Sequence, residues 1–252
     1  MKPWIYFSRE GNMTDKTVYV LIPAAGKGER MGGTIPKLLL KVDGVEVIIR
    51  TLQAFDRFAD SGVDVRAVLI TGESLVDDLD RLVKEYGIRC VSGITVGGAS
   101  RTESVGNGVK YLKGLGIKED DYIFIHDGAR CLVDQEILED CLKSISEHEV
   151  CVASVPVKST LKICESTPSG EVKVVNTPDR STIMEVQTPQ CFRYGTLVRC
   201  YEYAAENNVT ATDDTALAEM LGIDVYLTKG SYSNIKITTP EDIRIAESIT
   251  RR

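Results

Sequence analysis

Short β-branched runs alternate with amphipathic stretches along most of this chain, and that alternation constrains the fold more than any other feature. Five runs have the character of buried strands, at residues 18–23, 65–71, 88–93, 121–127 and 149–155. Helical patterns separate them. Parallel neighbours need a long crossover connection, so this repetition predicts an α/β fold. We expect a Rossmann-like, mostly parallel sheet with helices on both faces.

Capping residues place the starts of three helices. Ser100 and Glu103 have the spacing of a capping box, and Asp134 is a candidate N-cap for the helix that follows. Thr239 is a third N-cap, with Pro240 at the first helical position.

The alternation breaks at residues 156–182. Polar and apolar residues alternate there around a Pro-Ser-Gly turn, which predicts an antiparallel hairpin arm that projects from the sheet. An isolated hairpin is marginal in water, and a second copy of the chain is the simplest partner for it. The α/β pattern then resumes with helices near 195–206 and 213–221, strands at 224–228 and 234–238, and a last helix from Thr239.

Charge and apolar run length exclude several partners. The chain has 252 residues, with 30 basic against 37 acidic side chains and a formal charge of −7. This balance argues against nucleic acid or a polybasic membrane anchor, and the apolar stretches are too short to cross a bilayer. We therefore expect neither a nucleic-acid nor a membrane partner.

Seven cysteines, with no C-x-x-C pair and no secretory pattern, predict free thiols in a reducing compartment. Cytoplasm is the expected location. Residues 1–17 are interpreted as a polar leader, poorly ordered unless something ties it down. Residues 18–252 are interpreted as one domain that carries the arm.

The segment after the first strand carries the strongest chemical signal. Residues 23–33 read PAAGKGERMGG, and Pro36-Lys37 follows. Small residues let backbone N–H groups approach an anion, and this junction is where α/β sheets bind nucleotides. No G-K-[ST] closes the segment, and Met31 stands where a dinucleotide fingerprint has its third glycine. The residues alone allow a glycine-rich turn with solvated lysines or a loop around a triphosphate.

PAAGKGERM followed by PK resembles the signature of the sugar-nucleotide pyrophosphorylase-like transferases. Further motifs narrow the resemblance to the 2-C-methyl-D-erythritol 4-phosphate cytidylyltransferases of the non-mevalonate isoprenoid pathway. It extends from about Val18 to the last helix. The motifs are GGASRTESV (97–105), HDGAR (126–130), PVKSTLK (156–162), TPDRS (177–181), QTPQCF (187–192), TDD (212–214) and NIKITTPED (234–242).

This resemblance implies a Mg²⁺-dependent transfer of a cytidylyl group from CTP to 2-C-methyl-D-erythritol 4-phosphate, with release of pyrophosphate. An anionic phosphate oxygen attacks the phosphorus of another polyanion, so repulsion must be neutralised before in-line geometry is reached. A Mg²⁺ ion held mainly by phosphates suits this task. Arg30 and Lys37 are the catalytic residues that the resemblance implies, and they would stabilise the charge that develops at phosphorus.

The resemblance also implies two groups of binding residues. Residues of the nucleotide site would be Pro23, Ala24, Ala25, Gly26, Gly97, Gly98, Ser104 and Gly128. Residues for the acceptor phosphate would be Asp127, Arg130, Thr160, Arg180, Thr212 and Lys236, with Asp127 also the candidate metal ligand. Thr160 and Arg180 lie in the arm and would reach across a homodimer into the neighbouring site. The Gly97-Gly98 pair is equally interpreted as a turn before a capped helix.

Four positions depart from the family pattern: Leu38 stands where Gln is common, Gly128 where Ala is common, Cys131 where Pro is usual and Ser233 where many members have Asp. Ser233 leaves Asp127 as the better carboxylate candidate. Cys131 suggests thiol sensitivity. We expect His126 to be a buried structural histidine.

Three other functions remain open at this point. A cytidylyltransferase for ribitol 5-phosphate is similar, but that family typically has Ala-Gly-Gly where this chain has Pro23-Ala24-Ala25. A dinucleotide-binding oxidoreductase is disfavoured by Met31 and by the lack of an acidic ribose ligand after VLITG. A catalytically dead nucleotide-binding module is disfavoured by the cations Arg30, Lys37, Arg180 and Lys236.

Overall fold

The computed structural model describes residues 16–25 and 36–251. Most of the leader, together with Gly26 and Arg30, lies outside the described residues. No helix within the described ranges has the length and apolar character needed to cross a membrane.

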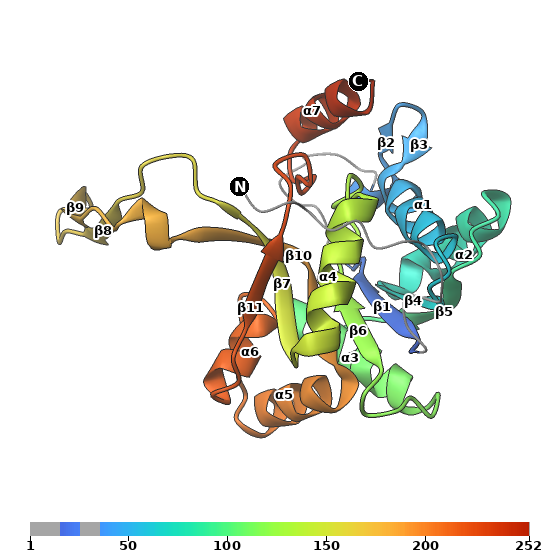
Figure 1. Cartoon of the computed structure of the whole chain (residues 1–252). Helices are drawn as coiled ribbons and strands as arrows, with labels where there is room; N and C mark the ends of the chain where they lie inside the picture. The colour runs from blue at the N-terminus through green and yellow to red at the C-terminus, as the bar shows by residue number, and fades with distance from the viewer. Residues whose placement is uncertain (1–15, 26–35, 252) are drawn as a thin grey trace, which may run out of the picture.

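A mixed seven-stranded sheet forms the centre of the described chain, in the order β11-β7-β10-β6-β1-β4-β5 (Figure 1). Strand β1 pairs in parallel with β4 and β6, β4 with β5, and β7 with β11. Strand β10 runs antiparallel to both of its neighbours, β6 and β7. The strands are β1 (Val18–Pro23), β4 (Val65–Thr71), β5 (Val91–Val96), β6 (Tyr122–Ile125), β7 (Val150–Pro156), β10 (Met184–Arg193) and β11 (Tyr226–Lys229).

Helices cover both faces of this sheet, which confirms the predicted α/β architecture. Alternate residues of β1 enter two separate cores: Ile22 packs in the cluster that contains Phe55, and Leu21 packs in the cluster that contains Leu197. The first cluster lies under α1 and α4, and the second lies under α3 and α5. The helices are α1 (Val47–Ala59), α2 (Val76–Glu85), α3 (Arg101–Lys113), α4 (Gln135–Glu147), α5 (Tyr194–Glu206), α6 (Thr215–Met220) and α7 (Pro240–Thr250).

The predicted helix caps are present. The Glu103 backbone N–H donates to Ser100 Oγ at 3.1 Å, and the Glu103 carboxylate accepts from the Ser100 N–H in return. The Ile137 N–H donates to the Asp134 carboxylate at 3.0 Å. Thr239 precedes α7 and forms a capping box with Asp242. These contacts fix where α3, α4 and α7 begin.

Two strand predictions need correction. The strand predicted at 88–93 begins at Val91, because the N–H groups of Arg89 and Cys90 donate to the Asp56 carboxylate of α1 instead of to a neighbouring strand. The segment 234–238 is not a strand.

The backbone of the segment 234–238 docks on the loop after β6 rather than pairing in the sheet. The Ile237 N–H donates to the Ala129 carbonyl in that loop at 2.9 Å.

The predicted hairpin arm is present between β7 and β10. Strands β8 (Ile163–Ser166) and β9 (Val172–Asn176) pair antiparallel in a sheet of their own, at the far end of two extended segments (Figure 1). The hairpin exposes apolar side chains, with Val172 73% and Val174 50% accessible.

Short elements complete the described chain: the 3-10 helices η2 (Lys37–Leu39), η3 (Glu73–Leu75) and η4 (Arg180–Thr182), and the small hairpin of β2 (Lys41–Val42) and β3 (Val45–Glu46).

Candidate active site

The candidate site lies where the parallel strands β1, β4, β5 and β6 reach their carboxyl ends. The Ala24 N–H donates to the Ile70 carbonyl at 2.6 Å, and the Gly97 N–H donates to the Thr71 carbonyl at 2.8 Å. The Gly128 N–H lies 3.3 Å from the Pro23 carbonyl. The backbone thus brings together three stretches of the predicted nucleotide site.

Close packing explains both glycines before α3. A Cβ atom added to Gly97 would lie 2.8 Å from Ser104 Oγ and 3.2 Å from the Ala25 Cβ. A Cβ atom at Gly98 would lie 2.4 Å from the Glu103 Cβ. Ser104 Oγ accepts from the Gly98 N–H at 3.0 Å, so the hydroxyl already braces the loop. The two interpretations of this glycine pair are therefore compatible, because a tight turn lies directly beside Ala25.

Asp127, just past β6, is a buried carboxylate among three cations. Lys236 Nζ lies 2.8 Å from Asp127 Oδ2, Arg101 Nε lies 3.7 Å from Oδ1, and Arg130 Nε lies 3.8 Å from Oδ2. Burial alone would raise the pKa of Asp127, but Lys236 and Arg101 lower it to about 2. The carboxylate is therefore charged at any working pH and does not act as a general acid.

The segments that carry Arg130 and Lys236 hold each other. Arg130 Nη1 donates to the Asn234 carbonyl at 2.7 Å, and the Asn234 side-chain amide donates to the Thr188 carbonyl at 2.9 Å. Asn234 has no exposed surface. This buried amide fixes the start of the segment in which Lys236 lies.

His126 is a buried structural residue, as expected. Its Nε2 lies 3.1 Å from the Arg130 carbonyl, which can only accept, so Nε2 carries the proton. Nδ1 then accepts from the Thr188 hydroxyl at 3.0 Å, and Thr188 Oγ1 in turn accepts from the Asp127 N–H. Burial lowers the pKa of His126 to about 4. The neutral ring therefore anchors the backbone on both sides of Asp127.

Arg101 is a site residue that the sequence interpretation missed. Its Nη2 lies 2.7 Å from Asp214 Oδ2, while its Nε faces Asp127. Asp214 Oδ1 accepts from the Tyr201 hydroxyl at 2.5 Å. Arg101 and Asp214 fall inside two of the motifs quoted above, GGASRTESV and TDD, and an Arg at the first position of a capped helix beside Gly97-Gly98 was the available signal.

The remaining predicted residues are spread more widely. Lys37 opens η2, which packs against α1. Thr212 is exposed, two residues before Asp214. Thr160 and Arg180 are exposed in the arm, where Arg180 Nη1 donates to the Lys158 carbonyl at 2.7 Å. Within the described part of the chain, no ion pair joins Arg180 to Asp127.

Two family departures have a structural reason. A Cβ atom at Gly128 would lie 2.9 Å from Ile48 Cδ1 and 3.3 Å from the Pro23 carbonyl oxygen, so the packing of α1 on this loop favours glycine. Ser233 Oγ lies 2.6 Å from Ser231 Oγ. The Ser233 hydroxyl therefore binds within its own loop, and Asp127 remains the carboxylate beside Lys236.

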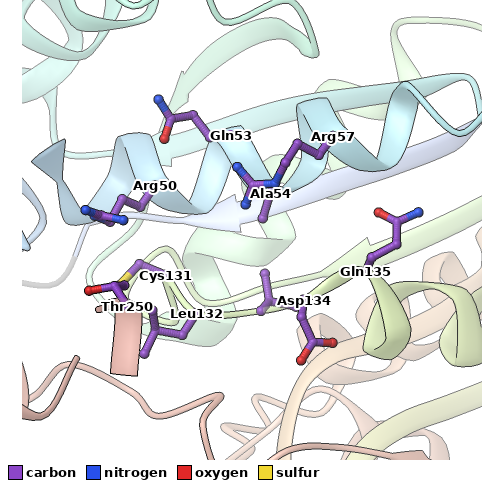
Figure 2. Close-up of a pocket in the computed structure, with 10 residues that line it drawn as sticks. Arg50, Gln53, Ala54, Arg57, Cys131, Leu132, Asp134, Gln135 and Thr250 are labelled. Carbon is purple, nitrogen blue, oxygen red and sulfur yellow. The ribbon is translucent and has the colours of Figure 1, made fainter. Parts of the chain in front are cut away.

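Cys131 lies next to a cavity of about 260 Å³ between α1 and the segment that leads into α4 (Figure 2). Arg50 and Arg57 of α1 border the same cavity. The cysteine is only 5% accessible, and burial raises the pKa of its thiol to about 11. Since the thiolate is the reactive form, this environment argues against the suggested thiol sensitivity of Cys131.

Comparisons with known proteins point to one family. The family model of 2-C-methyl-D-erythritol 4-phosphate cytidylyltransferase matches residues 18–252. Proteins of that name from Alkaliphilus oremlandii and Clostridioides difficile are 38% and 39% identical to this chain. The first match covers 92% of this chain and 95% of the relative, and the second covers 91% and 92%.

The fold agrees as well. A crystal structure of 4-diphosphocytidyl-2C-methyl-D-erythritol synthase from Anaerococcus prevotii superposes with a TM-score of 0.78 at 26% identity, covering 94% of this chain and 99% of the other. The cytidylyltransferase structure from Thermus thermophilus gives 0.72 at 27% identity, covering 92% and 98%. By sequence and by fold, the chain belongs to the 2-C-methyl-D-erythritol 4-phosphate cytidylyltransferase family.

Proposed function

We propose that the site around Asp127 carries out the family reaction, in which CTP and 2-C-methyl-D-erythritol 4-phosphate give 4-diphosphocytidyl-2-C-methyl-D-erythritol and pyrophosphate. The observation that carries this assignment is the buried Asp127 carboxylate among Lys236, Arg101 and Arg130. Arg101 directly follows the Gly97–Ser100 loop, which packs beside Ala25. Local positive charge on an acidic protein suits a reaction between two polyanions.

The acceptor phosphate is proposed to bind at Lys236 and Arg130. The Lys236 side chain is 40% exposed and has three N–H donors, so it can contact a phosphate while it stays near Asp127. An oxygen of this phosphate then attacks the α-phosphorus of CTP, and the bond from that phosphorus to the bridging oxygen of pyrophosphate breaks. The nucleophile is already ionised, so catalysis consists of positioning and charge stabilisation. We assign the charge stabilisation to Lys37 and to Arg30, which lies outside the described residues.

The cytidine is proposed to lie along Pro23, Ala24, Ala25 and Gly26 and against Gly97, Gly98, Ser104 and Gly128. Ala24 is 2% accessible and Ser104 is 4% accessible, so the walls of this site are already packed. Backbone groups and the Ser104 hydroxyl are proposed to read the base.

A divalent cation accompanies CTP in this family, and we propose Mg²⁺ for this chain. The described residues contain no cluster of three His, Cys, Asp or Glu side chains that would hold a metal alone. Asp127 offers one charged, hard oxygen ligand, and Mg²⁺ is commonly bound by one or two carboxylates together with substrate phosphates. The donor set therefore fits a phosphate-held Mg²⁺, which would neutralise phosphate charge when bound.

We propose that the chain is a homodimer in which each arm reaches the neighbouring site. Exposed apolar residues of the hairpin, Ile163, Val172 and Val174, support a covered surface. Thr160 and Arg180 would then serve the acceptor phosphate in the other subunit. All seven cysteines are free thiols. The cytoplasmic location stays a prediction from the sequence.

Mixed dimers test the arm assignment. Arg180→Ala removes the arm contribution, and Lys236→Met removes the body contribution. If the arm acts across the dimer, a mixed dimer has one site with both residues intact, so remixing two inactive variants restores roughly a quarter of the parent activity for statistical reassociation. Recovery at the background level, or a monomer by light scattering, would contradict the exchange.

The acceptor is tested by pyrophosphate release from CTP and Mg²⁺, with 2-C-methyl-D-erythritol 4-phosphate and ribitol 5-phosphate in parallel. Release with the first acceptor alone is expected. Release with ribitol 5-phosphate alone would keep the phosphate site and change the substrate. No release with either acceptor would reject the proposed activity.

A further inference from the structure

Arg101 connects parts of the site that lie far apart in the sequence. It is the first residue of α3 and directly follows the Gly97–Ser100 loop. The terminal nitrogen Nη2 of its guanidinium pairs with the Asp214 carboxylate, and the nitrogen Nε faces the Asp127 carboxylate. A single guanidinium is thus shared between two carboxylates through two nitrogens at a fixed separation, whereas a lysine has only one nitrogen to place.

Asp214 is itself held in place by hydrogen bonds and so fixes the position of the Arg101 guanidinium. Its side chain is 2% exposed, and one carboxylate oxygen accepts from the Tyr201 hydroxyl. Its backbone N–H donates to Gln190 Oε1 at 2.7 Å. The Arg101 guanidinium supplies the positive charge beside the Asp214 carboxylate. A buried carboxylate without such a cation would be strongly destabilising.

The other two cations at Asp127 have further partners. Lys236 is the most exposed of the three, and its ammonium group would be shared between a bound phosphate and the carboxylate. Arg130 lies 3.8 Å from Asp127 and donates to the Asn234 carbonyl. Arg101, anchored by Asp214, is the cation whose position does not depend on the acceptor.

We propose that Arg101 is a positioning residue that holds the Asp127 carboxylate in place while Lys236 and Arg130 bind the acceptor phosphate. Through its place at the start of α3, it also links the nucleotide loop to Asp127. The Asp214 carboxylate and the Tyr201 hydroxyl are the fixed support for this link. The inference rests on the proposed function, because it assigns Lys236 and Arg130 to the acceptor.

The variant Arg101→Lys separates the two contacts. A lysine keeps a positive charge for buried Asp214, so the protein is expected to fold, but it has no Nε beside Asp127. We expect kcat to fall about tenfold, since a displaced group costs orientation, while KM for CTP changes less than twofold. Arg89→Lys is the matched control, because Arg89 pairs at the surface with Asp60, and its kcat should stay at the parent value.

A double-mutant cycle with Asp127→Asn tests whether Arg101 acts through Asp127. In the Asp127→Asn background, Arg101→Lys should change kcat less than twofold. The melting temperatures of the same four proteins without substrate provide a second readout, and they too should be non-additive. This thermal cycle reports on the inference even if the parent proves inactive with the acceptors tested, so failure of the proposed function is recognised separately.

The variant Asp214→Asn tests whether Asp214 positions Arg101. It also provides a test of the inference if Arg101→Lys does not fold. It should lower kcat to a similar extent as Arg101→Lys, without an added effect when both are combined. Additive effects of Arg101→Lys and Asp127→Asn in both readouts, or a parent-like kcat for Arg101→Lys, would overturn the inference.

Discussion

Acidification should destabilise this protein through His126, a residue with no exposed surface. The ring is neutral in the fold because Nε2–H donates to the Arg130 carbonyl and Nδ1 accepts from Thr188. Protonation of Nδ1 would remove that acceptor and place a charge beside Phe55, whose ring lies 5.3 Å away. The unfolded chain, by contrast, binds the proton freely.

The pKa values determine the sign and size of the effect. The pKa of His126 is about 4 in the fold, against the ordinary value of 6.5. Between these values the unfolded chain binds a proton that the folded chain does not, so stability falls as the pH drops through 6.5 and levels off below about 4. From pH 7 to pH 5 this group should cost about 2 kcal/mol of the free energy of unfolding.

Urea unfolding at pH 7 and pH 5 measures this cost. The variant His126→Gln keeps an amide donor but cannot titrate, so its unfolding free energy should change about 2 kcal/mol less between the two pH values than that of the parent. The control is His148→Gln, which replaces the other of the two histidines with the same side chain. The ring of His148 is stacked on Tyr226 at the C-terminal end of α4, away from the contacts of His126. An equal loss of stability in the parent and in His126→Gln would refute the reasoning.

Three further predictions follow from local contacts. Gly98→Ala should lower the unfolding free energy by about 1–3 kcal/mol and raise KM for CTP, because the added Cβ would lie 2.4 Å from the Glu103 Cβ. The control Gly72→Ala should change neither quantity, because a Cβ there has open space around it. N-ethylmaleimide at neutral pH should leave buried Cys131 largely unmodified, as measured by mass spectrometry. Rapid labelling of Cys131 with loss of activity would contradict its burial. Lys236→Met should lower kcat/KM for the acceptor by roughly 10²–10³-fold and leave the Kd for CTP, measured by calorimetry, unchanged. A weakened Kd for CTP with an unaltered kcat/KM would argue against the assignment of Lys236 to the acceptor phosphate.

Local pattern predicted most of the fold because most elements are locally consistent. The parallel strands and their capped helices follow from hydrophobic period and from N-cap residues. Strand β10 was not predicted, because its centre holds Gln187, Thr188 and Gln190, all nearly inaccessible. These polar side chains bond to distant segments, so their burial has no signature in the period of the sequence. At residues 234–238 the opposite error occurred, because a strand was predicted where none is present. The alternation of polar and apolar residues there reflects docking on a loop rather than pairing in a sheet.

The site shows the same division. The motifs identified Asp127, Arg130 and Lys236 separately, and the structure places them within one cluster of charges. Arg101 was missed because its partner Asp214 lies far along the chain, and no local rule connects a helix start with a buried carboxylate on another element. Pairwise geometry of this kind depends on the order of strands in the sheet.

The place of the arm in the sheet has a consequence for how such a chain can change over time. Strands β7 and β10 are direct neighbours, and Pro156 is paired with Met184 at the point where the arm leaves them. The arm is therefore an elongated connection between two strands that a short turn would also join. Insertions, deletions and new side chains at its tip leave the pairing beneath it intact, so the surface that selects a partner can diversify while the chemistry of the sheet edge stays the same.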